Sequence, residues 1–294
     1  MNESNGTLAL HDGRCLGYAE FGDPVGVPLI YCHGFPASRL EGALLDVAAK
    51  QKGIRAIVPD RPGYGLSSFQ EGRQLVDWPE DLAQLTDHLQ LDRFLLIGIS
   101  GGGPYALAVA SQLPARLMAV SLVCPLGPVY RDEAVRLMQP PARFAFKAAR
   151  SPSALLRWMY GGLAGHAMRS KPELALALLA VAAPPADQAA LRRREVHRIL
   201  CASIREAFRQ GVRGVLHELV LYANLWRFEL ADIKVPVTLW HGDSDRTVPP
   251  AHTRMLADRL PDAEVHLVAD EGHFSLPINH ATDILGMLLE RIGR

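Results

Sequence analysis

The chain has 294 residues, of which 49% are hydrophobic, and its 31 Lys and Arg side chains balance 31 Asp and Glu, giving a formal net charge of zero. This balance, without a basic run, argues against a nucleic-acid partner. No apolar run is long enough to cross a bilayer, and the length suffices for a large buried core, in one α/β domain with an insertion or in two domains.

The four cysteines, Cys15, Cys32, Cys124 and Cys201, lie far apart and form no C-x-x-C pair. Their number does not require disulfides, so a reducing compartment is the simpler expectation. The first ten residues are polar and lack the apolar core of a signal peptide. We therefore expect a cytoplasmic monomer or homodimer that acts on a small molecule, with no nucleic-acid or membrane partner.

Strand and helix signals alternate over the first 125 positions. The continuous apolar runs are typical of strands buried on both faces, whereas a His-Asp-Gly turn separates two shorter strand candidates. Strands are predicted over 7–10, 14–20, 27–32, 54–58, 94–97 and 117–124. Helices are predicted over 38–49, 78–89 (with Asp77 as its cap) and 104–111. Such alternation predicts a parallel sheet with helices on both faces.

The alternation of strands and helices ends at Pro125, after which no convincing strand is predicted until about position 235. Helices are predicted over 131–148, 153–160, 171–183, 187–201, 204–209 and 214–224, with breaks at Pro140-Pro141, Gly161-Gly162 and Pro184-Pro185. Strands then return at 235–240 and 264–268, with helices over 252–260 and 278–292. The sequence thus predicts an α/β core formed by 1–126 and 231–294, interrupted by an all-helical insertion at 127–230.

A glycine-rich turn lies between the strand at 94–97 and the helix after it. In Gly98-Ile99-Ser100-Gly101-Gly102, the first and last glycines would approach closely, and a Cβ on either would clash. The turn would expose the Ser100 hydroxyl and leave the Gly101 amide free at a helix N-terminus. The G-x-S-x-G pattern in this context predicts a nucleophilic serine. The alternative is a glycine-rich turn with an incidental serine.

A nucleophilic serine needs a base, usually a histidine oriented by a carboxylate. Among the 11 histidines, only His33, His241 and His273 directly follow predicted strands, where reactive groups of a parallel sheet gather. His273 lies in a short Gly-His turn after the last strand and is the predicted base. His33 and His241 are predicted to brace loops.

The orienting carboxylate is expected after the penultimate strand, in the chain order Ser, Asp, His. Asp243 and Asp245 both qualify, and Asp245 is preferred because it lies further into the loop. Asp243 is expected instead to shape the turn through hydrogen bonds to the backbone. Asp270 is the third choice because it lies too near His273 in the sequence.

An acyl-transfer site also needs donors for a developing oxyanion. We expect the backbone amides of Gly101 and Phe35 in this role. The Phe35 ring and His33 are candidates for the substrate pocket, with Trp158, Tyr160 and Trp226 of the insertion as an apolar wall. The alternative is that the insertion aromatics only pack its helices together. Because no His, Cys and carboxylate cluster has metal-ligand spacing, neither a metal nor another cofactor is predicted.

Five motifs together resemble the α/β-hydrolase family, in its order, over about 7–125 and 233–292. They are His33-Gly34-Phe35-Pro36, Asp60-Arg61-Pro62-Gly63-Tyr64-Gly65-Leu66-Ser67, Gly98 to Gly102, His241-Gly242-Asp243-Ser244-Asp245 and Gly272-His273. The chain is similar to the branch with serine esterases, haloperoxidase-like hydrolases and proline iminopeptidases. The resemblance implies an α/β-hydrolase fold, a mostly parallel doubly wound sheet with a helical cap. It also implies a Ser100–Asp245–His273 triad and an oxyanion hole of the Phe35 and Gly101 amides.

The resemblance further implies a serine hydrolase with an acyl-enzyme mechanism, which we expect to be a carboxylesterase for a small or medium apolar ester. Ser100 argues against haloalkane dehalogenases and epoxide hydrolases, which use aspartate at this turn. The turn also lacks the Trp that proline iminopeptidases usually carry after the serine. A carbon–carbon bond hydrolase, an amidase or aminopeptidase, a lyase and a ligand-binding receptor with little turnover remain alternatives.

Overall fold

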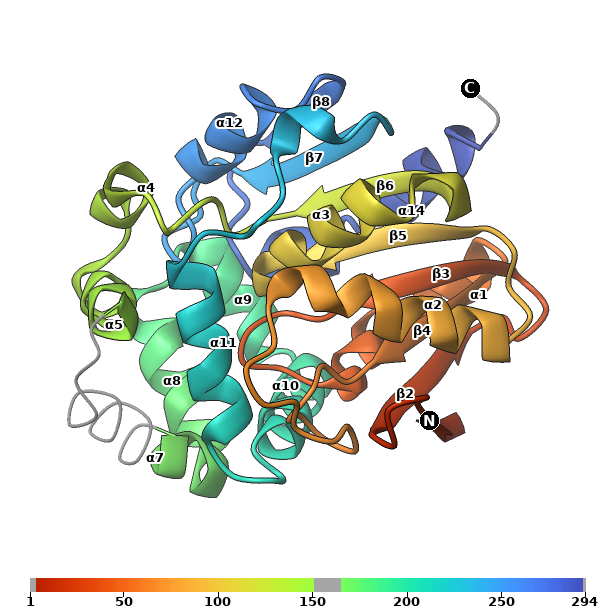
Figure 1. Cartoon of the computed structure of the whole chain (residues 1–294). Coiled ribbons are helices and arrows are strands. Elements are labelled where there is room, and N and C mark those ends of the chain that lie inside the picture. Colours follow the sequence, from red (N-terminus) through yellow and green to blue (C-terminus); the bar gives the residue numbers. More distant parts are fainter. Residues whose placement is uncertain (1–3, 151–164, 293–294) are drawn as a thin grey trace.

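A single eight-stranded sheet forms the centre of the computed structural model, which describes residues 4–150 and 165–292 (Figure 1). The strand order is β1-β2-β4-β3-β5-β6-β7-β8. The strands are β1 (Ser4–Ala9), β2 (Cys15–Gly22), β3 (Val27–Cys32), β4 (Ile54–Pro59), β5 (Phe94–Ile99), β6 (Leu117–Val123), β7 (Val237–Gly242) and β8 (Ala263–Val268). β2 runs antiparallel to β1 and β4, and all other neighbours are parallel, so the predicted mostly parallel sheet is confirmed.

Helices cover both faces of this sheet. The covering helices are α1 (Asp46–Gln51), α2 (Trp78–His88), α3 (Gly103–Gln112), α12 (Ala251–Ala257), α13 (Ser275–Asn279) and α14 (Ala281–Glu290). Alternate residues of β5 point to opposite faces. Leu96 joins the apolar cluster under α2, α3 and α12, whereas Leu95 and Ile97 join the cluster under α1 and α14. Burial on both faces explains why the central strands are uninterrupted apolar runs.

The helical insertion (127–230) lies between β6 and β7, and its described parts contain helices and no strand. Its helices are α4 (Asp132–Leu137), α5 (Pro140–Arg150), α7 (Gly165–Ser170), α8 (Pro172–Ala182), α9 (Pro185–Arg192), α10 (Arg194–Ala207) and α11 (Arg213–Ala223). They gather at the carboxyl ends of the central strands (Figure 1). The helix predicted over 153–160 lies outside the described residues.

Several predicted helices are divided in the structure. The helix expected over 38–49 is a 3-10 helix, Arg39–Leu44, followed by α1. The break expected at Pro140-Pro141 is confirmed, since α4 ends at Leu137 and α5 begins at Pro140, where proline begins a new helix more readily than it continues one. The predicted break between 201 and 204 is wrong. The chain instead becomes extended at Arg193 (φ −62°, ψ 121°), so α10 runs through that region.

Two further differences concern helix ends. The closing helix expected over 278–292 is interrupted at His280, which separates α13 from α14. Asp77 does not cap α2 with its side chain. Its carboxylate instead accepts a hydrogen bond of 2.7 Å from the Gln74 amide, which closes the preceding 3-10 turn, Leu75–Asp77.

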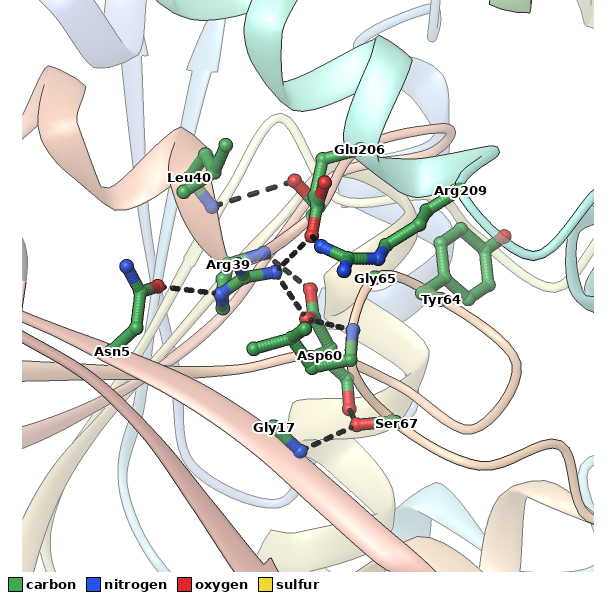
Figure 2. Close-up of polar contacts among 12 residues, drawn as sticks. Asn5, Gly17, Arg39, Leu40, Asp60, Tyr64, Gly65, Ser67, Glu206 and Arg209 are labelled. Atoms are coloured by element: carbon green, nitrogen blue, oxygen red, sulfur yellow. Dashed lines mark hydrogen bonds and ion pairs between the residues drawn. The ribbon is translucent and has the colours of Figure 1, made fainter.

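A buried ion network ties the helical insertion to the core (Figure 2). The Arg39 guanidinium lies 2.8 Å from the Asp60 carboxylate at the end of β4 and 2.7 Å from Glu206 on α10. Its Nε also donates to the Asn5 side chain of β1 at 2.8 Å. Because Arg39 is only 5% exposed, these contacts fix α10 against the sheet instead of leaving it as a loose cover.

No helix in the described part of the chain combines the length and the apolar composition that a membrane span requires.

Candidate functional site

The turn after β5 holds Ser100 in an uncommon backbone conformation. Its φ of 52° lies in the left-handed region, which non-glycine residues rarely adopt and which is often found at functional sites. A Cβ on Gly98 would lie 2.8 Å from the Gly102 carbonyl oxygen, and one on Gly102 would lie 2.0 Å from the Cys32 carbonyl oxygen. Both contacts are too short for any side chain, so the two glycines allow the tight turn.

Three candidate catalytic side chains meet at this turn. The Ser100 Oγ lies 2.9 Å from His273 Nε2, and His273 Nδ1 lies 2.7 Å from Asp245 Oδ2. They follow β5, β8 and β7, whose carboxyl ends lie at the same edge of the sheet. With the His273 proton on Nδ1 facing the carboxylate, Nε2 is free to accept the serine proton.

Asp245 is held rigidly on its other side. Its Oδ1 accepts hydrogen bonds from the amides of Thr247 and Val248, at 2.8 and 2.9 Å. Burial opposes the charged form of this carboxyl, but His273 and His241 more than offset it and hold the pKa of Asp245 well below its usual range. Asp245 is therefore a fixed carboxylate at neutral pH.

The pKa of His273 is shifted in the opposite direction to that of Asp245. Burial disfavours its protonated form, but the neighbouring Asp245 carboxylate outweighs this, with smaller contributions from Asp187 and Glu41, so the pKa of His273 lies above its usual value. An imidazole that readily takes a proton is suited to act as a base toward a hydroxyl.

The other two candidates for the orienting carboxylate, Asp243 and Asp270, have different partners. Asp243 accepts hydrogen bonds from the Asp270 amide (2.9 Å) and from the Ser244 hydroxyl (3.0 Å) at the surface. Asp270 is itself exposed. Of the three carboxylates considered, Asp245 is the one placed against the histidine.

His241 supports the loop that carries Asp245. Its Nδ1 lies 2.6 Å from the Thr253 hydroxyl and its Nε2 lies 2.8 Å from the Val248 carbonyl, while Nε2 is also 3.2 Å from Asp245 Oδ2. His241 thus contacts both the loop and the carboxylate, which gives it a wider part in the site than bracing a turn.

The two candidate oxyanion donors lie on adjacent loops. A Cβ on Gly101 would lie 2.6 Å from the Phe35 Cβ, so the loop after β3 passes directly beside the serine turn. The Phe35 ring packs edge-on against Tyr222 of α11, with ring centroids 5.6 Å apart. Their role as oxyanion donors stays a prediction.

The other predicted pocket residues have different surroundings. His33 is fully buried, and its Nδ1 lies 3.0 Å from the Gly34 carbonyl. Trp226, in the segment after α11, is 3% exposed and stacks on Phe228 with centroids 5.8 Å apart. Trp158 and Tyr160 lie outside the described residues. A pocket lined by these side chains stays a prediction.

The sequence patterns missed polar residues of the insertion that reach the site. Tyr222 donates a hydrogen bond of 2.8 Å to the Gly101 carbonyl and contacts Glu218 one turn earlier on α11. Glu218 in turn pairs with Arg61, whose guanidinium donates to the carbonyls of His33 and Gly34. Arg61 belongs to one of the five sequence motifs, but nothing in the sequence indicates that Glu218 and Tyr222 of the insertion reach the site.

Replacing Glu218 with glutamine should lower the free energy of unfolding by about 3–5 kcal/mol, because it leaves buried positive charge uncompensated. Arg61 and Arg73 have guanidinium nitrogens 2.7 and 3.7 Å from the Glu218 carboxylate, and all three side chains are at most 1% exposed. Urea unfolding should show a lower midpoint at an unchanged slope.

The matched control is Glu229→Gln, since Glu229 is 72% exposed and lies 3.7 Å from Arg259. An exposed pair of this kind contributes about 1 kcal/mol or less. Equal midpoints for the two variants would contradict the prediction.

One group of described side chains, Cys124, His241 and Asp245, could place metal-ligand atoms within 4.8 Å of one another. Their spacing in the sequence gave no indication of it, because Cys124 follows a different strand. The donor set fits a metal poorly. Burial raises the pKa of the Cys124 thiol well above its usual value, and both Asp245 oxygens already accept hydrogen bonds.

Comparisons with known proteins agree with this architecture. Over 111 residues the chain is 34% identical to an uncharacterized hydrolase, YcgS, of Bacillus subtilis, covering 38% of each chain. Over 126 residues it is 33% identical to a non-heme chloroperoxidase of Streptomyces lividans, covering 42% of this chain and 46% of that protein. These alignments therefore span less than half of either relative.

Among solved structures, an esterase of Thermogutta terrifontis has a TM-score of 0.69 at 22% identity, covering 99% of this chain and 97% of that one. Haloalkane dehalogenases and epoxide hydrolases are also similar to the chain, so similarity alone does not select one reaction. The family model described as alpha/beta hydrolase fold matches residues 27–279. The chain therefore belongs to the alpha/beta hydrolase fold family.

Proposed function

We propose that the protein is a serine hydrolase that forms an acyl-enzyme, and that its substrate is a small or medium apolar carboxylic ester. The observation that carries the proposal is the chain of contacts from Ser100 through His273 to Asp245, at 2.9 and 2.7 Å. A serine in place of aspartate at this turn favours acyl transfer over the dehalogenase and epoxide hydrolase reactions of similar proteins.

In the proposed reaction the Ser100 oxygen attacks the carbonyl carbon while His273 Nε2 takes the hydroxyl proton. The amides of Gly101 and Phe35 stabilise the negative charge on the carbonyl oxygen. His273 then gives its proton to the leaving alcohol, and the acyl group remains on Ser100. In the second half, His273 takes a proton from water, whose oxygen attacks the acyl carbon. His273 then returns this proton to the Ser100 oxygen as the bond between that oxygen and the acyl carbon breaks, and the acid is released.

A serine-directed fluorophosphonate probe tests this proposal. The probe should label the peptide that contains Ser100, and hydrolysis of a short-chain chromogenic ester should fall in proportion to the labelled fraction. Full labelling with undiminished ester hydrolysis would contradict it. A side-by-side assay of esters of different chain length, amides and substrates with a cleavable carbon–carbon bond would then identify the bond that is hydrolysed fastest. A preference for the amide or the carbon–carbon bond would replace the ester assignment.

The rate of ester hydrolysis should rise with pH along its acidic limb, because His273 acts as a base only when neutral. Since the pKa of His273 is raised above its usual value, mainly by Asp245 against the effect of burial, the midpoint of this limb should lie above the pKa of an unperturbed histidine. A profile of kcat/KM against pH measures it. A midpoint below the ordinary histidine value would show that another group controls the limb.

A further inference from the structure

A carboxylate from the helical insertion is buried against the loop that carries His273. Asp187 lies in the first turn of α9 and is 1% exposed. Its Oδ2 accepts a hydrogen bond of 3.0 Å from the His273 amide. Its Oδ1 accepts hydrogen bonds of 2.9 and 2.8 Å from the amides of Phe274 and Ser275. One side chain thus binds three consecutive backbone amides.

We propose that Asp187 is a positioning residue of the active site, which fixes the His273 loop from the helical insertion and places a negative charge near the imidazole. This inference rests on the proposed function for its catalytic consequence. Its structural and electrostatic parts concern His273 alone and can be measured without any substrate.

The shape of the loop supports this assignment. A Cβ on Gly272 would lie 2.4 Å from Asp187 Oδ2, so the loop approaches the carboxylate more closely than any other residue type would allow. The Gly272 amide donates instead to the Ser275 hydroxyl at 2.8 Å. Hydrogen bonds from amides to an ionised carboxylate are stronger than those to a neutral acceptor. The backbone on either side of His273 is therefore held by a residue 86 positions away in the sequence.

The charge of Asp187 also acts on the imidazole. Three carboxylates affect His273: Asp245 after β7, Asp187 on α9 and Glu41 in the 3-10 helix Arg39–Leu44. His241 contacts the Asp245 carboxylate at 3.2 Å, and the Phe274 ring, 5.4 Å from the His273 ring between centroids, carries no charge. Removing the Asp187 charge should therefore lower the pKa of His273, because the imidazolium loses one of these anionic neighbours.

Two substitutions separate the effect of Asp187 on the position of the His273 loop from the effect of its charge on the imidazole. Asp187→Asn keeps a carbonyl oxygen for the amides but removes the charge, whereas Asp187→Ala removes both. Asp270→Asn is the matched control, because Asp270 is exposed, belongs to the same loop and has a φ of 61°, which asparagine tolerates. Thermal unfolding of each variant shows whether it remains folded before the other measurements are made.

The primary measurement is an NMR titration of His273 in ¹³C-histidine-labelled protein. We expect its midpoint to move to lower pH in Asp187→Asn and to stay in place in Asp270→Asn. Coinciding titrations of the wild type and Asp187→Asn, or equal shifts in the two variants, would overturn the proposal.

For ester hydrolysis, Asp187→Ala should lower kcat by about a hundredfold, the effect of a reacting group displaced by roughly 1 Å, with little change in KM. The acidic limb of Asp187→Asn should move with the NMR midpoint. A folded Asp187→Ala with wild-type kcat would overturn the positioning role. Absence of Ser100-dependent turnover in the wild type would instead contradict the proposed function, while the NMR titration would still decide the inference.

Discussion

Replacing Ser100 with alanine should lower kcat for ester hydrolysis by roughly a millionfold, the effect of removing the nucleophile of a serine–histidine–aspartate triad. The change removes only the hydroxyl that lies 2.9 Å from His273 Nε2. Alanine at φ 52° is strained but no bulkier than serine, so the fold should persist. Stopped assays over hours with a chromogenic ester measure the residual rate.

The control for this change is Ser244→Ala. Ser244 lies in the loop after β7, and its hydroxyl donates to the exposed Asp243 carboxylate, which is not part of the proposed triad. It should hydrolyse the ester at nearly the wild-type rate. Equal turnover by Ser100→Ala and the wild type would show that another group carries the reaction, and the acyl-enzyme mechanism would have to be abandoned.

The sequence predicts those parts of the site that depend on the local residue pattern or on the topology of the sheet. The strand, turn and helix around Ser100 follow from an apolar run, two glycines that must approach closely, and the helix pattern after them. The places of Asp245 and His273 follow from a topological rule, because loops after parallel strands meet at one edge of the sheet. These inferences need no knowledge of how distant side chains pack.

The contributions of the helical insertion could not be predicted in this way. Asp187 appears in the sequence only as an acidic residue in the first turn of a helix, a common position with a local explanation. Its actual partners are amides 86 to 88 residues away, and the contact depends on how α9 packs against the His273 loop. The break at Arg193 was missed for a similar reason, since no glycine or proline marks it.

The helical insertion also contacts the loop that carries Ser100 and the neighbouring loop after β3. Tyr222 donates to the Gly101 carbonyl, and Glu218 holds Arg61 against the carbonyls of His33 and Gly34. Together with Asp187, these contacts reach three of the four loops on which the proposed reaction depends, those after β3, β5 and β8. A change in the packing of α9 or α11 should therefore alter the rate of the chemical step as well as the affinity for substrate.

The second large effect is expected from Asp245→Asn, which should lower kcat about ten-thousandfold while leaving the fold intact. The carboxylate accepts the Nδ1 proton of His273 at 2.7 Å. An asparagine that keeps its oxygen on the amides of Thr247 and Val248 must present its NH₂ group to Nδ1. The imidazole would then carry its proton on Nε2, where it can no longer accept the proton of Ser100.

Asp243→Asn provides the control that separates the two aspartates of this loop. Its carboxylate accepts from the Asp270 amide at the surface, so its loss should change kcat little. The pH profile offers a second distinction, because losing the Asp245 charge should lower the pKa of His273 and shift the acidic limb to lower pH. A large loss of activity in Asp243→Asn together with wild-type activity in Asp245→Asn would assign the orienting role to Asp243 and contradict the triad proposed for this chain.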